Sequence, residues 1–157
     1  MFRISSRTEY ALRAMIELAL RDDDRLMPAR EIAEAHQIPL RFLEQQLGAL
    51  HKAGLVESFR GAGGGCRLAR PSSGIRVSEI VDAIEGPSYA MFCLEPEDHT
   101  CFQDSRCGLQ TLWGDVQTAI REVFERTTLR DLAGRHQNLT PAGRPLFTAD
   151  DLLRSRA

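Results

Sequence analysis

The 157-residue sequence lacks several features that define common protein classes. No apolar run approaches the roughly 18 residues that a membrane-spanning helix needs, so we expect no contact with a membrane. The opening residues, MFRISSRTEYALR, are polar and charged, so we expect no secretory signal and a cytoplasmic location. In that reducing compartment, clustered cysteines indicate metal or redox chemistry rather than disulfides.

Motifs typical of enzymes are also missing. The four histidines are scattered along the chain, and no glycine fingerprint of a nucleotide-binding site is present. The glycine-rich run GAGGG, at 61–65, lacks the lysine of a P-loop. We therefore expect a protein that is not an enzyme.

The net charge of −2 averages two unlike halves of the chain. Residues 1–70 carry a net charge of +2 and residues 71–157 a net charge of −4. This asymmetry is compatible with a DNA-binding domain attached to an acidic body, although it is a weak signal by itself.

Three helices are predicted at the start of the chain. Ser6 is placed to cap the first, whose apolar residues recur every three or four positions. Pro28 suits the first turn of the second helix. After a short break, IPL, a third helix is predicted from about 39 to 53, with Gly54 as its stop and a stripe of Leu43, Leu47 and Leu50. Two short helices joined by a tight break predict a helix-turn-helix.

The segment after these helices predicts a β-hairpin. Two strand-like pieces, 55–59 and 66–69, flank the glycine run. Glycine allows the tip to adopt positive φ and brings its backbone close to a phosphate chain or into a groove. A hairpin that follows a helix-turn-helix in this way is a wing.

The second half of the chain predicts two further helices of different character. Residues 77–86 form a short amphipathic pattern, and a long helix is predicted to begin near Gly108. Its narrow apolar stripe suits packing against a second copy of itself, and consists of Leu109, Leu112, Val116, Ile120 and Val123. We therefore expect a homodimer.

Together these patterns predict a mainly α fold: a winged helix-turn-helix with a small β-hairpin wing and a long C-terminal dimerisation helix. We expect the DNA-binding domain at 1–86, a cysteine-rich cluster-binding loop at 87–107, the dimerisation helix region at 108–135 and a flexible tail at 136–157.

The residues predicted to contact DNA lie on the third helix and the wing. The run RFLEQQ places three polar side chains away from the leucine stripe, where Arg can read guanine, Gln adenine and Glu cytosine. The wing and its surroundings supply contacts to phosphate or to a narrow minor groove. The predicted set is Arg41, Glu44, Gln45, Lys52, Arg60, Gly63, Gly64 and Arg67, with Arg70 as a further phosphate partner. The alternative is a solvated helix face and a hairpin with no role in DNA binding.

Three cysteines, Cys93, Cys101 and Cys107, lie in one acidic stretch with the spacing C-x7-C-x5-C. Zinc sites more often contain close C-x2-C pairs, which this stretch lacks. Three thiolates on a loop can instead hold an iron–sulfur cluster. The residues alone leave iron–sulfur, zinc and redox thiols open. Cys66, in the predicted wing, is expected to be a small buried hydrophobic residue.

Three cysteines leave one coordination position to fill. His99 lies within the loop, and Gln110 follows Cys107 by three residues. Glu9 and His36 are candidates that a dimer partner would supply. Without such a role, Glu9 is an exposed carboxylate favoured by the helix dipole, and His36 a solvated helix end.

Taken together, these segments resemble the IscR/NsrR/RirA family of winged-helix iron–sulfur transcription regulators, which are of Rrf type. The resemblance covers roughly residues 1–135 and rests on four features in the same order. These are SSRTEYALRAMIELA, IPLRFLEQQLGALHKAGLVESFRGAGGGCRLARP, IRVSEIVDAIEG and the three cysteines before a long helix. The resemblance implies a homodimer whose long helices cross, a cluster near the dimer interface, and double-stranded promoter DNA as the partner.

The resemblance also assigns roles to individual residues. Glu44 and Gln45 match the recognition-helix LEQ, Arg60 matches the wing arginine, and the three loop cysteines match the cluster ligands. IscR-like members carry a histidine where this chain has Gln110, whereas the wide cysteine spacing is similar to RirA-type members. Glu9 stands where NsrR-like members place an acidic ligand to the partner's cluster, so Glu9 of the partner subunit is the first candidate for the fourth ligand and His99 the second.

The resemblance therefore implies a DNA-binding repressor whose iron–sulfur cluster senses iron, nitric oxide or redox stress. A 4Fe–4S cluster is favoured, with 2Fe–2S as the alternative. The first competing hypothesis is a winged-helix regulator without a cluster, which uses its thiols as a redox switch or zinc clamp. The second is a protein-interaction module that no longer binds DNA.

Overall fold

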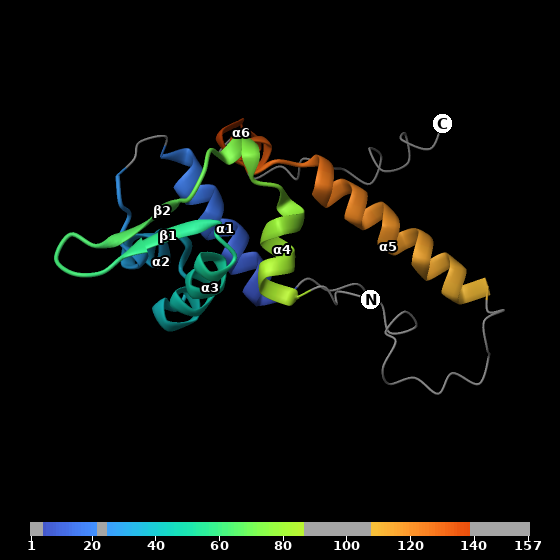
Figure 1. Ribbon diagram of the computed structural model, residues 1–157, viewed down its shortest axis with the longest axis horizontal. Coiled ribbons are helices and arrows are strands. Elements are labelled where there is room, and N and C mark those ends of the chain that lie inside the picture. The colour runs from blue at the N-terminus through green and yellow to red at the C-terminus, as the bar shows by residue number, and fades with distance from the viewer. Residues whose placement is uncertain (1–4, 22–24, 87–107, 139–157) are drawn as a thin grey trace.

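A computed structural model describes residues 5–21, 25–86 and 108–138 of the chain. Within them, helices dominate and one antiparallel hairpin forms the sheet (Figure 1). The predicted mainly α, winged helix-turn-helix fold is confirmed. In chain order the elements are α1 (Ser6–Leu20), α2 (Ala29–His36), α3 (Leu40–Lys52), β1 (Val56–Phe59), β2 (Gly65–Leu68), the 3-10 turn η1 (Ser72–Gly74), α4 (Val77–Glu85), α5 (Gly108–Arg126) and α6 (Leu129–Asn138).

Helix α1 is the centre of the fold. Its inward side is buried against α3, α4 and α6, and its small residues let these helices approach closely. The buried positions recur at helical spacing: Ala11, Ala14, Met15 and Leu18. The sequence placed the N-cap at Ser6, but Ser5 holds that position, and its hydroxyl accepts a hydrogen bond from the Thr8 backbone N–H. Ser5 and Ser6 are consecutive, and serine is favoured at an N-cap, so the sequence pattern alone cannot tell which of the two is the cap.

The helix-turn-helix is formed by α2 and α3. Gln37 ends α2 in the left-handed region at φ 53°, and Pro39 stands immediately before α3. The short break carries Ile38 into the core, where Ile32, Leu43 and Leu50 are also fully or almost fully buried. The predicted leucine stripe of α3 is therefore the face that packs, and the opposite face is left to solvent.

The wing is the β1–β2 hairpin, in which Phe59 pairs with Gly65. Both strands start one residue away from the predicted bounds. β2 gains a second neighbour, because Met27 and Cys66 exchange backbone hydrogen bonds of 2.9 Å. A Cβ on Gly65 would lie 2.6 Å from the Met27 carbonyl oxygen, so only glycine permits this approach. The tip turns at Gly63, whose φ is +80°.

The segment after α5 returns to the wing-bearing half of the molecule. Leu129 of α6 is fully buried in the same core as α1, and its backbone N–H bonds to the Ile75 carbonyl at 2.8 Å. Val77 likewise donates to the Thr127 carbonyl at 3.0 Å. We use the term head for α1–α4, the wing and α6, which share this core.

Helix α5 projects from the head and has no buried residue (Figure 1). An ion pair of 2.9 Å between Arg121 of α5 and Asp82 of α4 is one of its polar contacts with the head. Three of its stripe residues, Leu109, Leu112 and Val123, are 58%, 50% and 42% exposed. No helix in the described ranges is both long and apolar enough to cross a membrane.

Candidate nucleic-acid interface and its link to the cysteine segment

The outward face of α3 carries three of the predicted DNA-reading side chains. Arg41, Glu44 and Gln45 are exposed near the start of the helix, on the side away from the core. Gln46 is instead buried and donates to the Phe42 carbonyl at 3.3 Å, so it supports the helix and does not read DNA. The arrangement fits a recognition helix that enters a major groove with its first turns.

Phe42 is a candidate interface residue that the sequence analysis did not include. Its side chain lies on α3 beside Arg41 and is 55% exposed, which is unusual for a large apolar side chain. An exposed phenyl ring at this place can contact a thymine methyl group in the major groove. The sequence pattern could have indicated this residue, because Phe42 lies off the stripe of Leu43, Leu47 and Leu50 and is therefore an aromatic residue on the polar face of the helix.

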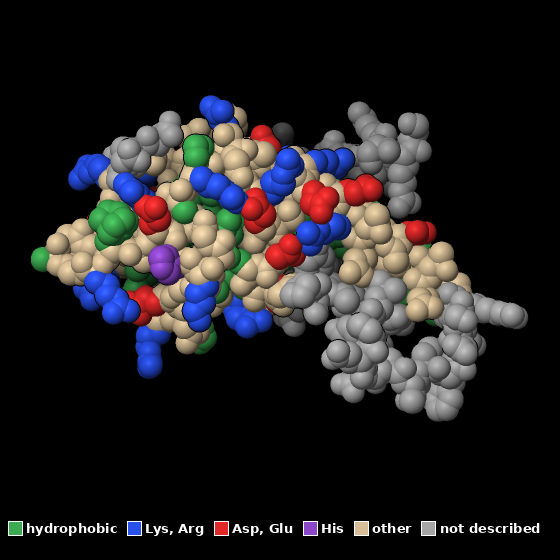
Figure 2. Space-filling view, in the orientation of Figure 1, with side chains coloured by type: hydrophobic (Ala, Val, Ile, Leu, Met, Phe, Trp, Pro, Cys, Tyr) green, Lys and Arg blue, Asp and Glu red, His purple; other side chains and the backbone are tan. Residues whose placement is uncertain are grey.

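The wing and the end of α3 present a second set of candidate contacts. Arg60 and Lys52 are exposed, and neither side chain has a hydrogen bond or ion pair within the described residues. Gly63 and Gly64 lie at the tip beyond Arg60. Figure 2 shows Lys and Arg side chains around the end of the molecule that bears the wing and α3. These cations are available to phosphate, which is the main source of nucleic-acid affinity.

Two other predicted phosphate partners are already engaged. The Arg67 Nε donates to Glu57 at 2.8 Å, and the guanidinium lies 5.5 Å from the centroid of the Phe59 ring. Arg70 is paired with Glu79. Both arginines therefore stabilise the wing and the start of α4 in the free protein. Among the predicted DNA-contact cations, Arg41, Lys52 and Arg60 have no side-chain partner within the described part of the chain.

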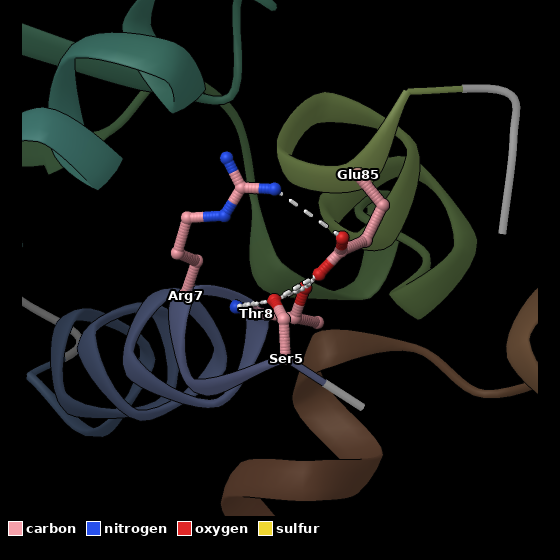
Figure 3. A network of polar contacts seen from close by, with 4 residues as sticks. All are labelled: Ser5, Arg7, Thr8 and Glu85. Atoms are coloured by element: carbon pink, nitrogen blue, oxygen red, sulfur yellow. Dashed lines mark hydrogen bonds and ion pairs between the residues drawn. The ribbon is translucent and has the colours of Figure 1, made fainter. Parts of the chain in front are cut away.

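Glu85 connects the end of α4 to the beginning of α1 (Figure 3). Its Oε1 atom accepts hydrogen bonds from the Ser5 and Thr8 hydroxyls, and its Oε2 atom lies 3.5 Å from the Arg7 guanidinium. Partial burial by itself raises the pKa of Glu85, but the hydrogen bonds from Ser5 and Thr8 and the Arg7 charge outweigh it, so the net pKa is lowered. The charged carboxylate therefore stabilises the fold above its ordinary pKa of 4.5, and this stabilisation is lost as the pH falls through the lowered value.

Two of the ligand candidates lie in the described part of the head. Glu9 is in the first turn of α1, exposed, and paired with Arg13 one turn later. His36 is only 14% exposed and its Nε2 atom lies 3.2 Å from a Glu17 carboxylate oxygen, so it is a packed helix end and not the solvated one that we expected. Of the two, Glu9 is the one that solvent can reach.

Cys93, Cys101, Cys107 and His99 lie outside the described residues. Among the residues that are described, no three His, Cys, Asp or Glu side chains are grouped so as to hold a metal ion. Gln110 is exposed in the first turn of α5. The three cysteines predicted as ligands belong to the 87–107 segment, which follows Glu85–Gly86 and precedes α5 in the sequence.

Cys66 has a structural role. It is buried within β2, its thiol donates to the Met27 carbonyl at 3.4 Å, and burial raises its pKa to about 11. A thiol with so high a pKa stays protonated and is a poor nucleophile and metal ligand. The expectation of a small buried hydrophobic residue at this position is confirmed.

The recognition helix, the glycine wing and the surrounding cations define a winged helix-turn-helix DNA-binding transcriptional regulator. A family model described as the Rrf2 iron-dependent transcriptional regulators matches residues 4–135, and this chain belongs to that family. The resemblance to the IscR/NsrR/RirA family of Rrf-type regulators found in the sequence is thereby confirmed. The chain is not an enzyme, since its relatives are named as transcriptional regulators.

Named relatives and solved structures support the same assignment. The chain is 35% identical over 142 residues to the HTH-type transcriptional regulator IscR of Yersinia pestis, covering 90% of this chain and 85% of the relative. IscR of Vibrio cholerae is 36% identical over 130 residues, covering 83% and 74%. The structure of CymR, described as the global cysteine regulator of B. subtilis, matches with a TM-score of 0.70 and 32% identity, covering 86% and 98%. IscR of T. potens matches with a TM-score of 0.68 and 29% identity, covering 88% and 92%.

Proposed function

We propose that this protein is a dimeric repressor of transcription, acting on promoter DNA in the cytoplasm, whose DNA affinity depends on an iron–sulfur cluster. The observation that carries the proposal is the order of its parts. An exposed recognition helix and wing are followed by three cysteines, and these are followed by a long helix with an uncovered apolar stripe. In the proposal, the cysteine segment binds the metal centre and lies between the element that reads DNA and the element that pairs two subunits.

The stripe of α5 supports the homodimer. Leu109, Leu112 and Val123 are largely exposed in the single chain, and leaving three such side chains in water on one helix face is unfavourable. A second α5 would cover them, because a stripe repeating every three or four residues packs against its symmetric copy. Two recognition helices would then face successive turns of the same duplex.

The donor set supports an iron–sulfur cluster. Cys93, Cys101 and Cys107 supply three thiolates, which is the ligand type that such clusters require. Glu9 is exposed on the first turn of α1, where a partner's segment can reach it, and this makes it our first choice for a fourth ligand, with His99 second. The absence of a nearby C-x2-C pair favours a cluster over zinc. We favour 4Fe–4S over 2Fe–2S on the resemblance to the family, whose RirA-type members have a similarly wide cysteine spacing.

A second candidate function follows from the solved relatives. One of them is named as a cysteine regulator, and another is a Staphylococcus aureus CymR described in an oxidised form. This favours, as the alternative, a regulator that uses the same cysteines as a thiol switch or zinc clamp. Iron and acid-labile sulfide in the anaerobically purified protein distinguish the two, because the alternative requires neither.

DNA recognition is tested most simply at Arg60. Duplexes are first selected from a random-sequence pool by the wild-type protein, and affinity for the selected duplex is then compared with that of Arg60→Ala. We expect a loss of about tenfold to a hundredfold and a shallower dependence on salt, because an unpaired wing cation contacts the phosphate chain or minor groove. Arg130→Ala is the matched control, since this exposed arginine lies on α6, across the head from α3 (Figure 1). Equal losses in the two variants would contradict a specific role for the wing.

A further inference from the structure

One carboxylate joins two segments that lie 77 to 80 residues apart in the chain. Glu85 accepts hydrogen bonds from Ser5, the N-cap of α1, and from Thr8 in its first turn (Figure 3). Its other oxygen lies 3.5 Å from the Arg7 guanidinium. The Thr8 side chain is fully buried and that of Glu85 is only 20% exposed, so solvent cannot easily replace these contacts.

Glu85 lies where the chain leaves this network for the cysteine segment. It is the last residue of α4, and after Gly86 the chain enters the segment that contains the three cysteines. On the other side of the network, α1 packs directly against the recognition helix α3. A shift of the α4 end would therefore change how the start of α1 is held, and α1 would carry that change to α3.

The electrostatics make the contact sensitive to such a shift. A carboxylate beside the first turn of a helix is stabilised by the helix dipole and by the unpaired N–H groups there. The same carboxylate is held by two hydroxyl donors and a guanidinium. Charge-assisted hydrogen bonds are short and directional, so a small displacement of Glu85 weakens several of them together.

We propose that Glu85 is the positioning residue through which the ligand state of the cysteine segment reaches the DNA-reading helix. The inference rests on the proposed function, because it requires a cluster or other ligand on that segment. It predicts that breaking the Glu85–α1 contacts uncouples DNA affinity from that ligand state and leaves cluster binding intact.

The test is a double-mutant cycle on the full-length protein. Affinity for the selected duplex is measured for four proteins: wild type, Glu85→Gln, a triple cysteine variant, and the combination of the two changes. The triple variant carries serine at Cys93, Cys101 and Cys107. All four proteins are purified anaerobically and assayed for iron. In the wild-type background, removing the cysteines should change affinity by about tenfold, the size of a typical allosteric coupling. In the Glu85→Gln background, the same removal should change affinity by less than about twofold, with iron content per chain unchanged by Glu85→Gln alone.

Two further variants guard against a merely structural effect. Thr8→Val removes one hydroxyl from the network while keeping the shape of a buried side chain, and it should reproduce the uncoupling. Glu31→Gln is the matched control, because it neutralises an exposed carboxylate on α2 that pairs with Arg21, and it should leave the tenfold coupling in place. Thermal unfolding of each variant shows whether it is folded at the assay temperature.

The outcomes distinguish a failure of the role proposed for Glu85 from a failure of the proposed function. If Glu85→Gln and Thr8→Val are folded and keep the full coupling, Glu85 does not transmit the signal, and the proposed function survives. If the iron-loaded wild type and the triple cysteine variant bind DNA equally, cluster sensing fails, and the role of Glu85 fails with it.

Discussion

Replacing Leu112 by aspartate is expected to convert the proposed dimer into a folded monomer and to abolish tight operator binding. Leu112 is half exposed on α5 in the single chain, so the substitution removes no contact from the core of the head. In a symmetric α5–α5 interface, however, the change occurs twice, and each unpaired carboxylate would be buried against an apolar stripe. Each 1.4 kcal/mol of lost association free energy raises a dissociation constant about tenfold. We expect the dissociation constant of the dimer to rise about a hundredfold or more.

Sedimentation velocity over a range of protein concentrations measures this effect directly. Thr111→Asp is the matched control: it places the same charge one residue earlier, at an exposed position off the apolar stripe. It should remain a dimer with wild-type affinity for DNA. A Leu112→Asp protein that stays dimeric, with its circular dichroism unchanged, would show that the subunits pair through another surface.

Replacing Cys93, Cys101 and Cys107 by serine is expected to remove essentially all bound iron. Serine keeps the size of the side chain but lacks the thiolate that an iron–sulfur cluster needs. The visible absorbance of the anaerobically purified protein should disappear, and its iron and sulfide content should fall to background. Because the described residues contain no alternative grouping of metal-ligating side chains, the head should not take over the role.

Cys66→Ser provides the control for that experiment. This thiol is buried, its pKa is about 11, and it donates to the Met27 carbonyl, which a serine hydroxyl can also do. The variant should keep its iron and its absorbance. Loss of iron from Cys66→Ser, or its retention in the triple variant, would contradict the assignment of the ligands.

Local patterns in the sequence predicted most of the head. Apolar residues recur at helical spacing in α1 and α3. This periodicity predicts which face of each helix is buried. The glycine run between two short apolar pieces similarly indicated the wing, because a tight turn demands positive φ there. The bounds moved by about one residue, as at Ser5 and Ser6, since neighbouring capping residues compete for one position.

Features that depend on distant segments were not predicted. The core uses Leu129, which follows the long helix, and no local pattern shows that α6 returns to pack on α1. The contacts of Glu85 with Ser5 and Thr8 also join positions about 80 residues apart. Glu57 and Arg67 are cross-strand neighbours, so their pairing follows from the hairpin register, which the sequence pattern predicts only to within a residue.

The central claim, that a cluster sets DNA affinity, is tested most directly by one titration. The anaerobically purified protein is titrated against a fluorescent duplex that it selected from a random pool. The titration is made before and after chelation removes its iron, at one fixed salt concentration. We predict that the two affinities differ by about tenfold or more, with the chelated protein still dimeric and folded. Equal affinity of the iron-loaded and iron-free dimers would contradict the account.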